Sequence, residues 1–193
     1  MAVSISLWAL MLAGSAVAGW IDALIGGGGL VLIPLIMSAM PQLAPAVALA
    51  SNKLAAVCGT ASAAVSLTRN VGVSRQQLIK YVPIALICSG IGAAAASAIN
   101  SDYMRPIVIV LLLASGTFVA LKPSFGKEIE GARKASKKGR VLALVLVGVV
   151  GAYDGLFGPG TGMFLIMGFT ALLSQSFLKS AALAKVVNTC TNI

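Results

Sequence analysis

The sequence contains no histidine, only five carboxylates and only three cysteines. Cys58, Cys88 and Cys190 each stand alone in apolar sequence, and no group of residues has the spacing of a zinc, haem or iron–sulfur site. We therefore expect no cofactor and no metal, and we interpret the cysteines as small buried packing residues. Because acid–base groups are so few, the sequence argues against an enzyme.

Charge is scarce as well. Only 10% of the residues are charged and 59% are hydrophobic, whereas a soluble domain carries about 25% charged residues. A membrane-spanning helix needs about 20 apolar residues, and continuous runs, unlike the short alternating segments of a barrel, predict helices. The sequence therefore predicts an all-α, polytopic transmembrane bundle in a lipid bilayer. The apolar runs are 4–38, 44–68, 79–99, 103–121, 141–172 and 180–193.

The net charge of +9 is concentrated in loops. Seven of the fourteen basic residues lie in 122–140, between two apolar runs, which indicates a cytoplasmic loop and no nucleic-acid partner. A second basic loop holds Arg69, Arg75 and Lys80. If each long run crosses the cell membrane once, placing both loops inside puts the N-terminus inside too. A re-entrant hairpin would invert part of that count.

An internal repeat is visible at a spacing of 132 residues. The segment G-W-I-D-A-L-I-G at 19–26 returns as G-A-Y-D-G-L-F-G at 151–158, and the same spacing pairs Lys53 with Lys185. Aspartate and lysine are rare here, so these matches predict a duplicated unit, as in many transporters. Loop charges favour two parallel units.

The repeat divides the chain into three parts. Residues 1–121 form a first transmembrane unit of about four spans, 122–140 a basic cytoplasmic loop, and 141–193 an incomplete second unit. By the same spacing, a whole second unit would continue for about sixty residues past Ile193.

Each unit contains a glycine-rich break within an apolar run. Consecutive glycines make poor helix, so we expect a non-helical break and then a short helix around Leu30–Met37. A helix that starts inside the membrane presents free N–H groups and a positive dipole end, which suit a small anion. The alternative is close helix packing by small residues. The residues assigned to substrate binding on this basis are Gly26, Gly27, Gly28, Gly29, Gly158, Gly160 and Thr161.

Two aspartates, Asp22 and Asp154, lie inside apolar runs, each four residues before a break. A carboxylate in mid-membrane costs at least about 2.5–3.5 kcal/mol, so it needs a purpose. Either it caps the freed N–H groups of the break, or it takes part in proton coupling or gating. A structural alternative pairs Asp22 with Lys53 and Asp154 with Lys185.

Each unit also carries a lysine beside an amide. Lys53 follows Asn52 about ten residues into its apolar run, and Lys185 lies one turn from Asn188. A lysine that merely reaches for the membrane surface normally lies near a helix end. At this depth a polar cavity is the better interpretation, and we predict an anion pocket between the units that these four residues help to form.

The motifs resemble those of a known family. The stretch D-A-L-I-G-G-G-G-L-V-L-I-P at 22–34 with A-L-A-S-N-K-L at 48–54, and Y-D-G-L-F-G-P-G-T-G at 153–162 with A-K-V-V-N at 184–188, are similar to the sulfite exporter TauE/SafE family. The resemblance covers nearly the whole chain. It implies a bacterial-type cytoplasmic-membrane permease that transports small sulfur-containing anions such as sulfite or sulfonates. By this resemblance we expect the final spans of that family to be missing from this sequence.

The predicted function is therefore transport of a small anion, with export and proton coupling as further expectations. Two alternatives stay open: a transport-inactive membrane scaffold or partner subunit, and a transporter of an unrelated small metabolite. The sequence leaves the oligomeric state open.

Overall fold

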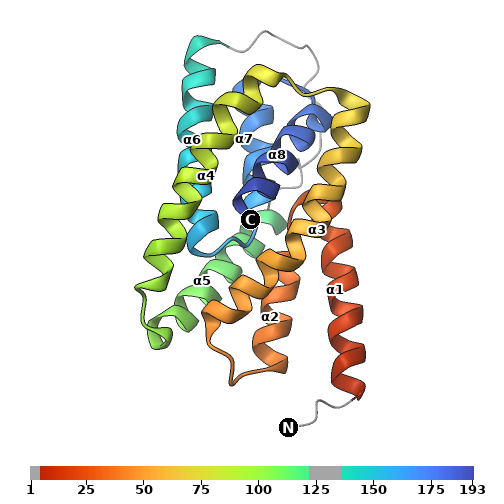
Figure 1. Cartoon of the computed structure of the whole chain (residues 1–193), viewed down its shortest axis with the longest axis vertical. Coiled ribbons are helices and arrows are strands. Elements are labelled where there is room, and N and C mark those ends of the chain that lie inside the picture. Colours follow the sequence, from red (N-terminus) through yellow and green to blue (C-terminus); the bar gives the residue numbers. More distant parts are fainter. Residues whose placement is uncertain (1–4, 122–135) are drawn as a thin grey trace.

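Figure 1 shows the computed structural model, of which residues 5–121 and 136–193 are described. These residues form helices and contain no strand, which confirms the predicted all-α fold class. The helices are α1 (Ile5–Ile25), α2 (Gly29–Ala39), α3 (Pro45–Val71), α4 (Arg75–Ser97), α5 (Ser101–Ala120), α6 (Lys137–Leu156), α7 (Thr161–Leu173) and α8 (Phe177–Thr191).

Both glycine-rich segments interrupt a helix. Between α1 and α2, Gly26 adopts a φ of +80°, and between α6 and α7, Gly158 and Gly160 adopt φ values of +86° and +83°. Only glycine takes this left-handed conformation without a steric cost. The short helix expected around Leu30–Met37 is confirmed as part of α2.

The helix starts follow the spacing of the sequence repeat. Gly29 and Thr161 begin α2 and α7, and α3 and α8 begin at Pro45 and Phe177. Each of these two pairs lies 132 positions apart. This shared spacing supports the proposal of two related units, each opening with a broken helix pair. We call α1–α2 the first hairpin and α6–α7 the second hairpin.

The two hairpins enter the molecule from opposite ends (Figure 1). α1 runs from the end marked N to the middle and α2 returns, whereas α6 starts at the other end and α7 returns there. The units are therefore inverted, and the parallel arrangement favoured by the loop charges is wrong. The N-terminal end of α1 also lies at the opposite end of the molecule from the basic α3–α4 connection (Figure 1).

The tightest helix contact is between α4 and α6, and it depends on glycine. A Cβ added at Gly155 would lie 2.0 Å from the carbonyl oxygen of Ser89, and one at Gly92 would lie 2.1 Å from that of Ala152. Small residues allow helix backbones this close in a membrane. Around this contact lies a core cluster drawn from α4, α6, α7 and α8, which includes Phe169.

Outside the core, the surface of the bundle is apolar. Within residues 5–121 and 136–193, four helices are long and apolar enough to cross a membrane (α1 as far as Leu24, α4, α5 and α6), and large side chains such as Trp20 (68% exposed) lie on their outer faces. This surface suits lipid. Cys58 is exposed, so the expectation that all three cysteines are buried is wrong.

The basic loop expected over 122–140 falls largely outside the described residues, which resume at Ser136. Its last residues are helical rather than loop, because α6 begins at Lys137 and Ser136 caps it by accepting a hydrogen bond from Gly139 N–H. Side-chain caps of this kind fix the first turn of a helix.

Candidate functional site

The first break is held by Asp22, in the last turn of α1. Its carboxylate accepts a hydrogen bond from the N–H of Gly28 at 3.1 Å, and the residue is only 6% exposed. A freed N–H in an apolar interior needs such a partner. Asp22 therefore caps the broken backbone, which does not prevent a second role for its other oxygen.

The second aspartate binds a lysine of the other unit. Lys53 Nζ, from α3, lies 2.7 Å from Oδ2 of Asp154, from α6. It also donates to the carbonyl oxygen of Thr191, near the end of α8, at 3.2 Å. A charged group this deep is tolerated when it is paired and hydrogen-bonded.

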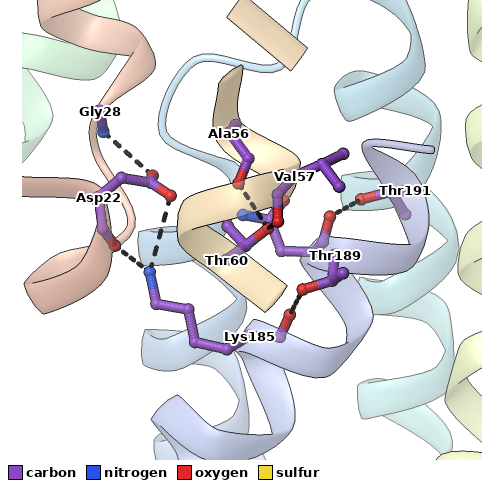
Figure 2. A network of polar contacts seen from close by, with 9 residues as sticks. Asp22, Gly28, Ala56, Val57, Thr60, Lys185, Thr189 and Thr191 are labelled. Carbon is purple, nitrogen blue, oxygen red and sulfur yellow. Dashed lines mark hydrogen bonds and ion pairs between the residues drawn. The ribbon is translucent and has the colours of Figure 1, made fainter. Parts of the chain in front are cut away.

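The reciprocal pair is shown in Figure 2. Lys185, from α8, points toward the end of α1, where it donates to the carbonyl oxygen of Asp22 and lies 3.9 Å from the carboxylate Oδ2. The Lys185 side chain is fully buried. The Oδ2 atom of Asp22 has no hydrogen-bond partner among the described residues, so this ion pair is looser than the one between Lys53 and Asp154.

Both pairs therefore connect the two units. The structural alternative, in which Asp22 pairs with Lys53 and Asp154 with Lys185, is wrong. The units are inverted, and α3 packs against α8, so each lysine reaches the aspartate at the end of the opposite hairpin. We call these contacts the exchanged ion pairs.

Between the exchanged ion pairs, the two breaks touch each other. A Cβ added at Gly26 would lie 2.7 Å from Cα of Gly162, and one at Gly162 the same distance from Cα of Gly26. No side chain fits between these backbones. The first break therefore meets the start of α7. Gly29 and Gly162, from the first turns of α2 and α7, line one small space, where two helix N-termini place positive partial charge.

A small cavity of about 10 Å³, which we call the central cavity, lies at this meeting point. Its volume is about that needed by one water molecule. Eight of the residues predicted from sequence line it, from both units. They are Asp22, Gly26, Gly29, Asn52, Asp154, Gly158, Gly160 and Asn188.

The remaining predicted residues do not line this cavity. Lys53 and Lys185 each contact an aspartate that does, Asp154 and Asp22. Gly28 donates to Asp22 and Gly27 faces the side chain of Met163. The hydroxyl of Thr161 donates to the carbonyl of Gly158 at 2.8 Å, so its proton is already committed to the backbone.

Sequence reasoning missed Asn192. It lines the cavity one helical turn after Asn188, whose Oδ1 is buried without a hydrogen-bond partner in the described part of the chain. The signal was present, because residues four apart share one face of a helix. Two amides in an apolar segment at this spacing predict a polar face.

A second cavity, of about 40 Å³, lies between α1, α2 and α3. It shares Asp22, Gly29, Asn52 and Ala56 with the central cavity and extends to Ser15. Asp22 and Asn52 therefore line both cavities, and the second cavity, whose lining is mostly apolar, extends from them along the first hairpin.

The inverted hairpins, the buried charges and the apolar outer surface together define the class: a polytopic membrane protein with the architecture of a transporter. The family model described as Sulfite exporter TauE/SafE matches residues 11–193. The chain belongs to this family, which is one of membrane transporters and not of enzymes.

Curated relatives agree with this assignment. The probable membrane transporter protein YfcA of Escherichia coli K12 is 36% identical over 91% of this chain, and the chain spans 64% of that relative. Relatives in Sinorhizobium sp. and Haemophilus influenzae, also named probable membrane transporter proteins, are each 34% identical over 97% and 100% of this chain and 70% and 74% of their own lengths. No solved structure matches.

Proposed function

We propose that this chain forms the greater part of a permease for a small anion. The observation that supports this most directly is the pair of exchanged ion pairs on either side of an amide-lined cavity where two helix N-termini meet. Helix N-termini and amide N–H groups are donors that suit oxyanions. Lys185, which is fully buried, and Lys53, which is partly buried, supply the cationic charge that an anion needs in a medium of low dielectric constant.

The exchanged ion pairs also suggest how a proton is coupled to the anion. While Asp154 is ionised, its carboxylate forms an ion pair with the ammonium group of Lys53, at 2.7 Å. A proton taken up by Asp154 removes that attraction and leaves the lysine able to bind an incoming anion. Proton and anion then favour each other's binding, as linkage requires. Asp22 and Lys185 repeat the arrangement in the other half.

The described conformation is a closed one under this proposal. A cavity of about 10 Å³ holds about one water molecule, whereas sulfite has one sulfur and three oxygen atoms. One hairpin has to move away from the other before such an anion enters. Inverted units provide two equivalent movements, one opening toward each side, which is the basis of alternating access in many transporters.

The substrate class and direction rest on the family. Its description as a sulfite exporter supports a sulfur oxyanion, such as sulfite or a sulfonate, and export. If the basic ends of α3, α4 and α6 face the cytoplasm of a bacterial cell, an inside-negative potential of about 100 mV favours exit of an uncoupled monoanion by about 2.3 kcal/mol. Export coupled to one proton is electroneutral and independent of that potential.

Anion flux into and out of proteoliposomes tests the proposal, using the full-length gene product that contains this sequence. Sulfite, a small sulfonate, sulfate and chloride are compared, with and without a pH gradient. We expect selective flux of a sulfur oxyanion that a pH gradient drives, and at least a tenfold loss in Lys53→Ala. Lys138→Ala, which removes an equal charge from the exposed start of α6, serves as the matched control.

Two results would contradict the proposal. Folded protein that moves none of these anions would exclude the substrate class. Unchanged flux in Lys53→Ala and Lys185→Ala would separate the exchanged ion pairs from transport and leave them a structural role.

A further inference from the structure

The second large polar feature of the molecule lies away from the exchanged ion pairs. A cavity of about 440 Å³ opens where α4, α6 and α8 begin. Its charged lining consists of Lys80, Arg140 and Lys179, one from each of these helices. No carboxylate from the described residues lines it. We call it the basic cavity.

Neutral donors complete the polar side of the basic cavity. Gln77 and Gln175 line it and contact each other, with Nε2 of Gln77 3.4 Å from Oε1 of Gln175. The side-chain nitrogen of Gln175 is itself buried and has no hydrogen-bond partner within the described ranges. A buried donor without a partner is uncommon in folded proteins, and here it belongs to a residue that lines the cavity.

The other side of the basic cavity is apolar. Val141, Leu144 and Leu173 line it. From Val141 an exposed apolar stripe continues along α6 through Val145 and Val149, which are 57% and 64% exposed. Residues four apart share a helix face, so this stripe leads from the cavity along the surface that faces lipid.

We propose that the basic cavity binds the phosphodiester headgroup of an anionic phospholipid, with an acyl chain lying along Val141, Val145 and Val149. Basic pockets between transmembrane helices suit such headgroups. The same cations would accept a free phosphate or sulfite, but a free anion has no use for the apolar stripe. The volume also suits a headgroup far better than a single ion. This site does not depend on the proposed transport function.

Binding is measured on the purified full-length protein in detergent, by titration with short-chain phosphatidylglycerol. Short-chain phosphatidylcholine, inorganic phosphate and sulfite are titrated in parallel. We expect saturable binding of phosphatidylglycerol at least tenfold tighter than of phosphatidylcholine, phosphate or sulfite. Because each basic residue near a headgroup contributes about 1 kcal/mol, the double variant Lys80→Gln/Lys179→Gln should bind phosphatidylglycerol about 20- to 30-fold more weakly.

The matched control is Lys137→Gln/Lys138→Gln, which removes the same charge from the same end of the molecule without touching the cavity lining. It should bind phosphatidylglycerol within about threefold of the unaltered protein, since only general surface attraction is lost. Lys80 and Lys179 are exposed, so their replacement should not prevent folding.

Three outcomes would overturn the proposal. Equal loss in both double variants would mean diffuse attraction to a basic surface. Phosphate or sulfite binding that is as tight as phosphatidylglycerol and is weakened equally by Lys80→Gln/Lys179→Gln would identify a site for free oxyanions in the basic cavity. No saturable lipid binding would exclude a headgroup site. Since the measurement is of binding and not of flux, each outcome is independent of whether the protein transports an anion.

Discussion

The two hairpins have the same signature and different surroundings. α6 packs against α4, and 39% of the most apolar stretch of α6 is buried inside the molecule. In α1 the buried share of the corresponding stretch is 11%. Gly151 in α6 would place a Cβ 3.1 Å from the carbonyl of Ala85, but its counterpart Gly19 in α1 has nothing within 4 Å. The local fold thus follows the repeated sequence, while burial depends on which helix covers it.

The same contrast reaches the candidate site. Lys185 is fully buried and 3.9 Å from the carboxylate of Asp22, whereas Lys53 is 19% exposed and 2.7 Å from that of Asp154. The hairpin that is more exposed to lipid thus faces the lysine that is less exposed. The exchanged ion pairs are equivalent in sequence position but not in environment. We therefore expect equivalent substitutions in the two pairs to change stability by different amounts.

The largest expected effect comes from removing the partner of the fully buried lysine. Asp22→Ala removes the carboxylate and leaves Lys185 its bond to the carbonyl of residue 22, and loss of one member of a buried pair costs about 3–5 kcal/mol. Asp154→Ala should cost less, because Lys53 is partly exposed and keeps its bond to Thr191. Unfolding of both variants in detergent micelles measures the difference.

A double variant provides the control for this comparison. Asp22→Ala/Lys185→Met removes both charges, so it should recover much of the stability that Asp22→Ala loses. If Asp154→Ala lowers the stability as much as Asp22→Ala does, the exposure of the unpaired lysine does not determine the loss of stability.

A smaller effect is expected at the α4–α6 contact. Gly155→Ala places a methyl group 2.0 Å from a backbone oxygen of α4, so the helices must separate, and overpacking costs about 1–3 kcal/mol. The counterpart of Gly155 in α1 is already Ala23, which is exposed. The melting temperature of the purified protein reports the change.

Gly19→Ala is the matched control on the first hairpin. It meets no atom within 4 Å and adds helix propensity, so stability should hold or rise by up to about 1 kcal/mol. Destabilisation by Gly19→Ala would show that another helix covers this face of α1.

The sequence was sufficient for the features that depend on local chemistry. The glycine runs predicted both breaks, because left-handed backbone at Gly26 and Gly158 excludes most other residues. The rarity of charge in apolar runs singled out Asp22 and Asp154, and both line the central cavity.

The arrangement of the units could not be obtained in the same way. The loop charges favoured parallel units on the assumption that each long apolar run crosses the membrane once, whereas α1 and α2 turn back in the middle of the molecule (Figure 1). The partner of Lys53 depends on that arrangement, since only inverted units bring it to Asp154. Asn192 was not predicted, because its place in the cavity lining depends on which face of α8 is directed toward the breaks.

The smallest expected effect concerns Thr161, whose counterpart in the first hairpin, Gly29, has no hydroxyl. Thr161→Val keeps the shape and removes the hydrogen bond to Gly158, which should cost about 0.5–1.5 kcal/mol. The carbonyl of Gly158 still accepts from the N–H of residue 161, so the lower end is expected. Thr161→Ser retains the bond and should be neutral.

Flux through the same two variants decides between structure and substrate for this hydroxyl. Because its proton is directed at Gly158 and not into the central cavity, anion flux per folded molecule should change by less than about twofold in Thr161→Val. A loss of flux in Thr161→Val alone, at unchanged stability, would mean that the hydroxyl turns toward the anion when the hairpins open. The second hairpin would then hold a substrate donor that the first hairpin, with Gly29 at this position, cannot supply.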